Sequence, residues 1–369
     1  MNRLISEKVE GVTWTLYLPK GASPNAEQRL LRERTADTRI VRIENSSGAS
    51  LRRAIVARPC DLLFVPSGAV APALSVPVVP WVHDVDIFEH PEWFPEPFLR
   101  RQITTRLFRR GVERAKHILT ASKATSTHLS ELFGIPMERM TITSEGGDDV
   151  LSALQGGALH DAKARAKFRM AERGITNPYI LVLGTLEPRK NLPMIIQAWA
   201  DARKKFRRPF DLVVVGRDGW KLGPITGAID VAKSYTGEGM SRFHRLEAPT
   251  DDDRRDIELA AEIVVVPSFS EGFGLVALEG MQAGAMVVAS SAGALPEVVG
   301  DAGILLPPED QAAWTQTLVN LVKDDETRRH FAELGKSRSQ GMTWARSAEI
   351  ACRVLTEAAN SGTLAPQKS

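Results

Sequence analysis

The stretch from Ile263 to Gly300 constrains the fold of this 369-residue chain more than any other. It opens with four β-branched residues, Ile263 to Val266, whose lack of polar alternation is typical of a strand buried on both faces of a parallel sheet. A glycine turn follows, then apolar residues at helical spacing, then a second apolar strand from Met286 to Ala289. This order predicts a right-handed crossover in a parallel sheet, with the glycine turn directed at a ligand.

The glycine turn contains residues suited to bind that ligand. Gly272 and Gly274 let the backbone approach a bulky group, and the free N–H groups of the helix that begins at Leu275 suit a phosphate. Glu271 precedes the turn, and Glu279 lies about one helical turn inside the helix. Carboxylates accept hydrogen bonds from sugar hydroxyls, so the turn predicts a nucleotide-sugar site. Two solvated carboxylates near a helix start would give the same pattern.

Two further features follow predicted strands. His83 comes after the apolar run 76–82, and Arg189 and Lys190 lie on the loop after a strand from Tyr179 to Leu183. That loop belongs to the same sheet edge as Glu271, where open α/β sheets bind ligands. On the residues alone, a structural histidine and two solvated loop cations remain the alternatives.

The pattern E-G-F-G-L-x-x-L-E-x-M-x-x-G, at residues 271–284, resembles the E-x7-E signature of the retaining nucleotide-sugar glycosyltransferases called family 4. The resemblance extends, in the family's order, through WVHD at 81–84, GTLEPRKN at 184–191 and ALPEVVGDAG at 294–303. It covers most of the chain after Asp61. It implies an α/β protein with the GT-B fold, in which two Rossmann-like domains with parallel sheets face each other.

The resemblance also implies roles for individual residues. Glu271 and His83 would be catalytic, with His83 facing the transferred sugar or the acceptor hydroxyl. Arg189 and Lys190 would neutralise the pyrophosphate as the glycosidic bond breaks, so neither a metal nor a cofactor is expected. Many relatives carry arginine where this chain has Thr185, and Arg189 would supply that contact. The donor-binding residues would be Arg189, Lys190, Gly272, Phe273, Gly274, Leu275 and Glu279.

Alternating strands and helices divide the chain into two α/β halves. Family members open with a strand and a glycine-rich loop beside the donor phosphates, and none precedes Thr13. We therefore expect either an acceptor-side domain shortened at its start or a protein that begins upstream of Met1. The expected parts are an N-terminal acceptor-side domain at 1–170, a nucleotide-sugar-binding domain at 175–343, a helix crossing back at 344–360 and a tail at 361–369.

Composition excludes several classes of protein. The 47 basic and 45 acidic residues leave a net charge of +2, which gives no general drive toward nucleic acid. Cys60 and Cys352 lack C-x-x-C spacing, so neither a disulfide framework nor a zinc site is indicated. Every apolar run is short or broken by proline, so the sequence predicts no membrane span and a cytoplasmic protein.

Residues 98–117 predict a helix with two different faces. Leu99, Ile103, Leu107 and Val112 form an apolar stripe. The plainer interpretation is a solvated helix packed on the first domain, and the alternative is peripheral contact with the anionic inner face of a membrane. The opposite face is basic: Arg100, Arg101, Arg106, Arg109, Arg110, Arg114 and Lys116.

Together these features predict a transferase that moves a hexose, with retention, from a nucleoside diphosphate sugar to a glycan or lipid-linked acceptor in envelope or exopolysaccharide synthesis. By resemblance alone, mannose from GDP-mannose is the first expectation. An NAD-dependent oxidoreductase is one alternative, because Gly272, Gly274 and Ala277 match the dinucleotide fingerprint and Glu297 lies about twenty residues on. A non-catalytic sugar-nucleotide-binding partner of a transferase is the other.

Overall fold

The computed structural model describes residues 12–21, 38–45, 47–66, 74, 76–235, 240–246 and 250–360. The start of the chain and the tail expected at 361–369 lie outside these residues. The chain divides into two compact units. The first draws on the described parts of 1–88, 96–145 and 344–369, and the second on those of 89–95 and 146–343.

The main chain enters the second unit earlier than the sequence predicts. It does so at Gly146, whereas the expected first domain runs to residue 170. Helix α8 (Gly156–Glu172) accounts for the difference, because it packs against α11 (Asp251–Ala260) of the second unit. Arg169 of α8 also forms an ion pair with Asp256 of α11.

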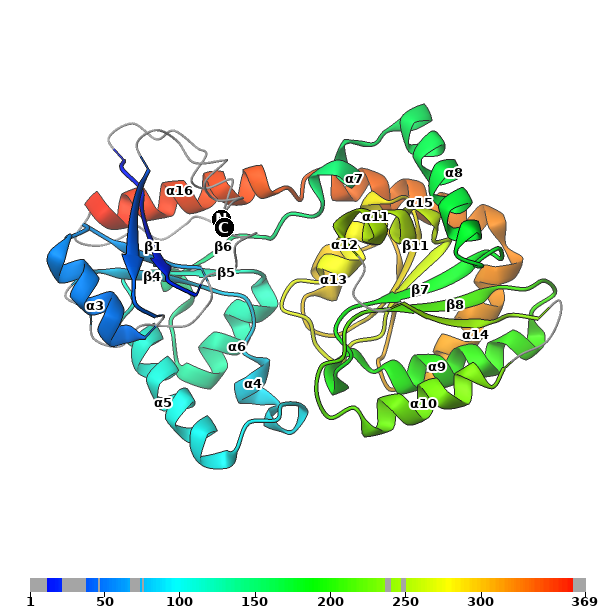
Figure 1. Ribbon diagram of the computed structural model, residues 1–369, viewed down its shortest axis with the longest axis horizontal. Helices are drawn as coiled ribbons and strands as arrows, with labels where there is room; N and C mark the ends of the chain where they lie inside the picture. The colour runs from blue at the N-terminus through cyan, green and yellow to red at the C-terminus, as the bar shows by residue number, and fades with distance from the viewer. Residues whose placement is uncertain are drawn as a thin grey trace. The chain divides into compact units, whose positions relative to one another are not determined.

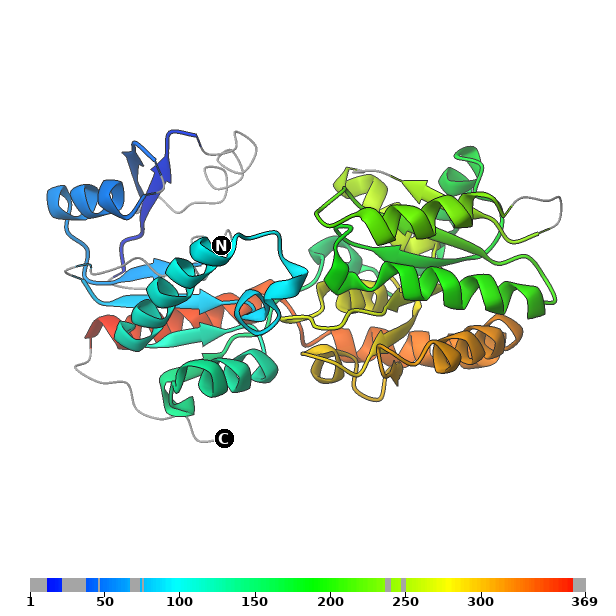
Figure 2. The same cartoon turned by 90° about the horizontal axis from the view of Figure 1, so that it is seen from below.

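The first unit contains two parallel sheets (Figures 1 and 2). One pairs β1 with β2, and the other has four strands in the order β3-β4-β5-β6. The strands are β1 (Thr15–Pro19), β2 (Arg39–Ile43), β3 (Leu63–Val65), β4 (Val78–Val82), β5 (Ile118–Thr120) and β6 (Met140–Ile142). The helices are α3 (Gly48–Ala57), α4 (Asp86–Glu89), α5 (Phe98–Arg114), α6 (Lys123–Phe133) and α16 (Trp344–Asn360).

Successive residues of β4 face opposite sides of its sheet, as the period of a strand requires. Val79 and Trp81 pack with the buried face of the final helix α16, so this helix belongs to the core of the first unit (Figure 1). Val82 lies on the other side, in a cluster with Val112 of α5 and Leu129 of α6. The four-stranded sheet is thus covered on both faces.

The apolar stripe predicted for α5 is only partly buried. Val112 is 0% exposed, whereas Leu99, Ile103 and Leu107 are 72%, 52% and 41% exposed. Helix α5 packs on the first unit through Val112, in agreement with the plainer interpretation, but the first part of its apolar stripe stays exposed. Among the described residues, no helix combines the length and the apolar character needed to cross a membrane.

The second unit is built on a six-stranded parallel sheet with the order β12-β11-β10-β7-β8-β9. Its strands are β7 (Tyr179–Leu183), β8 (Asp211–Val215), β9 (Phe243–Leu246), β10 (Ile263–Val266), β11 (Met286–Ser290) and β12 (Ile304–Leu306). Besides α8 and α11, its helices are α7 (Asp149–Ala153), α9 (Leu192–Ala202), α10 (Gly223–Lys233), α12 (Leu275–Gln282), α13 (Leu295–Val299), α14 (Gln311–Lys323) and α15 (Asp325–Ser339).

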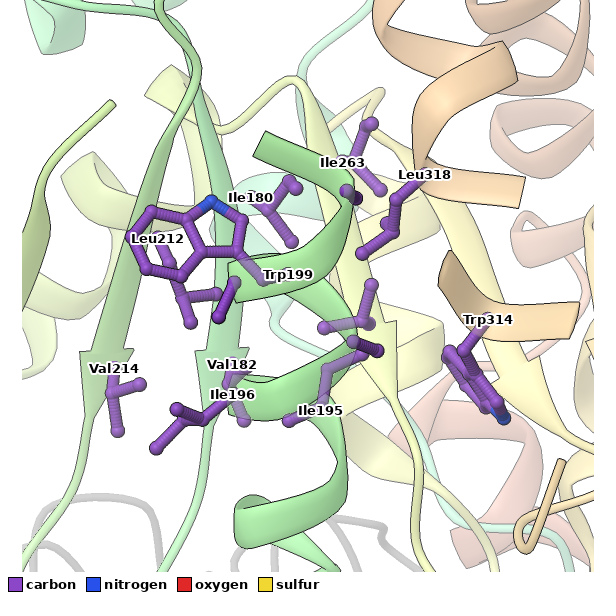
Figure 3. Close-up of a cluster of buried hydrophobic side chains, with 14 of the residues drawn as sticks. Ile180, Val182, Ile195, Ile196, Trp199, Leu212, Val214, Ile263, Trp314 and Leu318 are labelled. Carbon is purple, nitrogen blue, oxygen red and sulfur yellow. The ribbon is translucent and has the colours of Figure 1, made fainter. Parts of the chain in front are cut away.

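One large apolar cluster fixes α9 and α14 on this sheet (Figure 3). Ile180 and Val182 point from β7 toward Ile196 and Trp199 of α9, and Trp314 enters from α14. Trp199 and Trp314 are completely buried, and each indole N–H donates to a backbone carbonyl. Because a buried tryptophan needs such a partner, these bonds hold the two helices in register with the sheet.

The strand order creates a switch point in the second unit. β7 is the first strand of the sheet along the chain, and it pairs with β8 on one side and β10 on the other. The chain thus builds outward in one direction and then returns to build in the other. In open α/β sheets, ligands bind beyond the carboxyl ends of the two strands at such a point.

Candidate functional site

The loops after β7 and β10 meet at the switch point. The loop after β7 ends in a 3-10 turn, Pro188–Lys190, directly before α9. The loop after β10 contains the glycine turn and leads into α12. A backbone bond from the N–H of Phe269 to the carbonyl of Arg189, at 2.9 Å, ties the two loops together.

Glu271 is the centre of a charged cluster between these loops. Its Oε1 accepts from the Nζ of Lys190 at 2.6 Å and from the hydroxyl of Ser268 at 2.7 Å. Its Oε2 accepts from Nη1 of Arg189 at 3.2 Å. Burial raises the pKa of Glu271, but the charges of Lys190 and Arg189 outweigh burial and hold it below its usual range. Glu271 is therefore ionised at neutral pH.

Arg189 has a second carboxylate partner that sequence reasoning missed. Oε1 of Glu187 accepts from Nε and Nη2 of Arg189 at 3.2 and 3.0 Å, and its side chain is only 4% exposed. The cluster therefore holds two cations and two carboxylates. Because the guanidinium is fixed by Glu187, its Nη1 edge is the part aimed at Glu271 and the glycine turn.

The glycine turn contains a residue with a positive φ at the start of α12. Gly274 has a φ of 107° and stands as the N-cap of α12. The positive φ is the feature that selects glycine here, since L side chains rarely adopt it. Phe273 is buried beneath the turn. With Gly272 and Leu275, these residues set the first N–H groups of α12 beside the charged cluster.

Glu279 projects from α12 into a different polar cluster, on the side of α11. Its Oε2 accepts from Nη1 of Arg254 at 2.6 Å. Burial raises the pKa of Glu279, although Arg254 opposes that rise. Arg254 is not among the site residues predicted from the sequence, although the run of three aspartates and two arginines at 251–255 is an available signal of a charged helix start.

His83 lies in the first unit, at the carboxyl end of β4. Its Nδ1 is 2.7 Å from Oε1 of Glu145, and its Nε2 is 2.7 Å from the carbonyl oxygen of Pro66. A carbonyl oxygen only accepts hydrogen bonds, and an ionised carboxylate does the same, so both ring nitrogens carry protons. Burial lowers the pKa of His83, but the bonds to Glu145 and Pro66 outweigh it and raise the pKa overall. The raised pKa and these two contacts favour the imidazolium form of His83.

The structure gathers Glu271 and every predicted donor-binding residue in the second unit, around α12 and the loop after β7. It places His83 in the first unit. In the described part of the chain, no group of three or more His, Cys, Asp or Glu side chains is arranged to hold a metal ion.

The model of the family described as glycosyl transferases group 1 matches residues 177–324. O-antigen chain mannosyltransferase B of Escherichia coli is 31% identical over 263 residues, which cover 71% of this chain and 65% of that protein. Serotype-specific mannosyltransferase WbdA of Escherichia coli is 27% identical over 291 residues, covering 75% of this chain and 34% of that protein. The chain thus spans less than two thirds of the length of these curated relatives.

Solved structures of glycosyltransferases resemble the whole fold. WaaG, a glycosyltransferase involved in lipopolysaccharide biosynthesis, aligns with a TM-score of 0.72 and 18% identity over 96% of this chain and 94% of its own. HepE from Anabaena, in complex with UDP, aligns with a TM-score of 0.71 and 19% identity over 93% of this chain and 92% of its own. These comparisons confirm the recognition of a family 4-like chain and its α/β class. Residues 177–324 therefore match the glycosyl transferases group 1 family, in a chain with the GT-B fold.

Proposed function

We propose that the chain is a glycosyltransferase that moves a hexose from a nucleoside diphosphate sugar to a glycan or lipid-linked acceptor, with retention at the anomeric carbon. The observation that carries the proposal is the meeting of Arg189, Lys190 and Glu271 at the switch point, beside the start of α12. Mannose is the proposed sugar, because two of the curated relatives are mannosyltransferases of O-antigen and serotype-specific glycans. We assign the reaction to the cytoplasm and to envelope or exopolysaccharide synthesis.

The cations and the helix start would bind the diphosphate. Breaking the glycosidic bond leaves negative charge on the outgoing phosphate, and preorganised positive charge stabilises that state. Lys190 offers a point charge, Arg189 a planar edge, and α12 its first N–H groups. We propose that these groups bind the diphosphate without a metal or a cofactor.

The two glutamates would divide the recognition of the sugar and the nucleoside. The diphosphate competes for Lys190 and Arg189, so its arrival frees the Glu271 carboxylate to accept a hydrogen bond from a hydroxyl of the transferred sugar. Glu279, farther along α12, would accept from the ribose hydroxyls. Phe273 would support the turn from below.

His83 would serve the transferred sugar or the acceptor as a hydrogen-bond donor. An imidazolium donates from both ring nitrogens, so an oxygen of the sugar would replace the carbonyl of Pro66 as the partner of Nε2. Glu145 would remain on Nδ1 and hold the ring in place. In this role, the imidazolium would stabilise a hydroxyl or a leaving oxygen by donating a hydrogen bond to it.

The basic helix α5 suits the lipid-linked form of the acceptor. Leu99 and Ile103 are exposed beside a surplus of arginines, which is the pattern of a helix lying on an anionic membrane surface. Each basic residue near such a surface adds about 1 kcal/mol of attraction. We propose peripheral contact of α5 with the inner membrane face.

Specific observations argue against the dinucleotide alternative. Gly272 and Gly274 follow β10, whereas the first strand of this sheet is β7, and the loop after β7 lacks the glycine fingerprint. Glu297 lies inside α13 rather than at the end of the next strand. The fingerprint acts in the first βα turn with its acid at a strand end, so neither requirement is met.

A screen of nucleotide sugars tests the proposal. The protein is incubated with GDP-mannose, UDP-glucose and other nucleotide sugars, with a mannose oligosaccharide as acceptor and with or without EDTA. We expect nucleoside diphosphate release from GDP-mannose that survives EDTA, and a product that keeps the donor's anomeric configuration by NMR. Binding without turnover of any donor would favour the non-catalytic partner, and an inverted product would overturn retention.

A further inference from the structure

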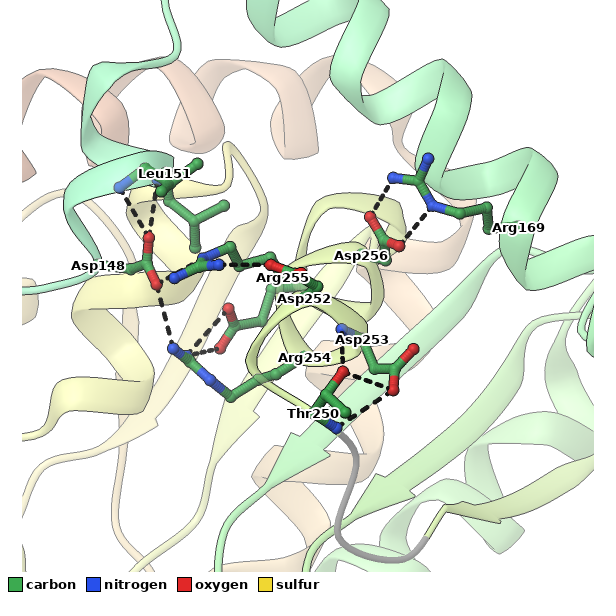
Figure 4. Close-up of polar contacts among 11 residues, drawn as sticks. Asp148, Leu151, Arg169, Thr250, Asp252, Asp253, Arg254, Arg255 and Asp256 are labelled. Atoms are coloured by element: carbon green, nitrogen blue, oxygen red, sulfur yellow. Dashed lines mark hydrogen bonds and ion pairs between the residues drawn. The ribbon is translucent and has the colours of Figure 1, made fainter. Parts of the chain in front are cut away.

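The guanidinium of Arg254, in the second unit, is bonded to three carboxyl groups. Figure 4 shows its bond to Asp148. Nη1 of Arg254 donates to Glu258, one turn along α11, at 3.0 and 3.3 Å. The same Nη1 donates to Oε2 of Glu279 at 2.6 Å. Nη2 donates to Oδ2 of Asp148, just before α7, at 3.2 Å. Three segments that are distant in sequence are thus joined by one side chain.

The charges of this cluster do not balance if every acid is ionised. The side chains of Glu258, Asp148 and Glu279 are only 2%, 5% and 13% exposed. Arg255 adds a second cation, but it is bonded to Asp148 at 2.8 Å and to Asp252. Glu258 and Glu279 must therefore share Nη1 of Arg254. Two buried carboxylates this close cannot both ionise cheaply, so one of them keeps a proton.

Glu258 is the carboxyl that keeps the proton. Its burial, followed by the nearby charge of Glu279, raises the pKa of Glu258 to about 8. The hydrogen bond with Glu258 opposes the rise in the pKa of Glu279 that burial causes. The geometry is that of a neutral Glu258 hydrogen-bonded to the Glu279 carboxylate, with Arg254 holding both.

Other charged groups around α11 are already engaged among the described residues. From α8, Arg169 pairs with Asp256 and Arg173 pairs with Asp253. From β7, the hydroxyl of Tyr179 donates to the carbonyl of Ile257 at 2.5 Å. Arg254 is consequently the cation bonded to Glu258, and nothing in these contacts offsets the charge that Glu258 would gain on losing its proton.

We propose that Arg254 and Glu258 are positioning residues that hold the Glu279 carboxylate ready for the ribose of the donor. This inference rests on the proposed function, in which Glu279 binds the ribose. Arg254 fixes one oxygen of Glu279, and the proton of Glu258 bridges the two acids. The remaining lone pairs of Glu279 then point to the ribose hydroxyls.

A defined pH dependence follows. Below about pH 8 the proton of Glu258 is present and Glu279 is held. Above it, Glu258 ionises, repels Glu279 and competes for Nη1 of Arg254. Donor binding should therefore weaken as the pH rises, by up to about tenfold per pH unit for one linked proton.

Calorimetric titration with GDP and UDP, from about pH 6 to about pH 9.5, tests this in wild-type protein and three variants. Glu258→Gln keeps a neutral side chain of the same shape, so it should bind as wild type at neutral pH and lose the weakening at high pH. Arg254→Met should bind about tenfold or more weakly, because a charged hydrogen bond is lost, with little change in kcat at saturating donor. Arg169→Met removes another arginine that is bonded to α11, and it should bind GDP and UDP as wild type does.

The outcomes separate this inference from the proposed function. If nucleotide binding by Glu258→Gln still weakens with rising pH in parallel with wild type, this inference alone is overturned. Normal nucleotide binding by Arg254→Met would overturn it as well. A carboxyl 13C titration of ligand-free protein provides a second check. An ordinary glutamate pKa for Glu258 would also contradict the inference. If wild-type protein binds neither GDP nor UDP at any pH, the proposed function is contradicted, and with it the ribose-binding role of Glu279.

Discussion

Lys190 is the residue on which the diphosphate role can be tested most simply. Its ammonium is 2.6 Å from Glu271 and belongs to the preorganised charge beside α12. Lys190→Ala should lower kcat by about 100-fold or more, the scale of losing one transition-state contact. Steady-state kinetics with saturating donor would measure it. Lys204→Ala, which removes an exposed ammonium paired with Asp201, is the matched control. Normal turnover in Lys190→Ala would refute the leaving-group role.

The two glutamates of the signature should fail in different ways. Glu279→Gln should raise the KM for the donor and leave kcat nearly unchanged, because a ribose contact is made equally in the ground and transition states. Glu271→Gln should lower kcat, because its carboxylate acts on the transferred sugar. Measuring kcat and KM for both variants checks this division. If both substitutions have small and equal effects on kcat and KM, the two acids have only a structural role.

His83 gives a prediction that needs no substrate. Removing the charge of its partner, by Glu145→Gln, should lower the pKa of His83, which an NMR titration of its ring would show. Below the ordinary pKa of 6.5, His83 is protonated in folded and unfolded states alike, so the pair's full stabilisation is present there. This stabilisation is lost as the pH rises through the raised pKa that His83 has in the folded state. Glu145→Gln should therefore reduce the melting temperature more in acid than in alkali, and a uniform reduction would contradict the pairing.

Single residues could be predicted from the sequence where their position follows from the order of strands and loops along the chain. The loops of Lys190 and Glu271 follow two apolar strands, so their meeting at one sheet edge could be foreseen from the α/β pattern. Glu187 and Glu258 lie only two and four positions from the arginines that they bind, so their spacing was an available signal that was not used. The bonds of Arg254 to Asp148 and Glu279 could not be predicted, because they arise only when separate segments pack. Arg254, for example, is 106 positions from Asp148, and no local spacing signals that bond.

Helix α5 carries a prediction at the scale of one element. The double change Leu99→Ser with Ile103→Ser should abolish much of the binding to vesicles that contain anionic lipid and leave thermal stability unchanged, because both side chains are largely exposed. Vesicle co-sedimentation measures the binding, with neutral vesicles for comparison. Phe168→Ser, at an exposed position of α8, is the matched control. A wild-type protein that binds both kinds of vesicle equally would contradict the membrane role.

The elements themselves were predictable to different degrees. The strands at Tyr179–Leu183 and Ile263–Val266 stand at the predicted residues, because runs of buried β-branched and apolar side chains admit few other structures. Helix α8 lies almost wholly within the expected first domain at 1–170, but it belongs to the second unit. Its weak apolar face gives little local information, and its ion pairs to α11 decide where it packs.

At the scale of the whole molecule, the order of the strands could not be read from the sequence. The crossover rule predicts parallel pairing of Ile263–Val266 with the strand after it, which the structure confirms in the register of Val264 with Val287. That β10 also pairs with β7 depends on the packing of α9 and α14 over the sheet. This pairing is what joins the Arg189 loop to the glycine turn.

The central claim is that these two loops form a donor site for a nucleoside diphosphate sugar. Calorimetric titration of the wild-type chain with GDP, UDP and NAD tests it most directly, with Lys190→Ala as the companion variant. The account predicts that at least one nucleoside diphosphate binds in the presence of EDTA, that its binding weakens in Lys190→Ala, and that NAD does not compete. Binding of NAD in preference to both diphosphates, or diphosphate binding that is unchanged in Lys190→Ala, would contradict it.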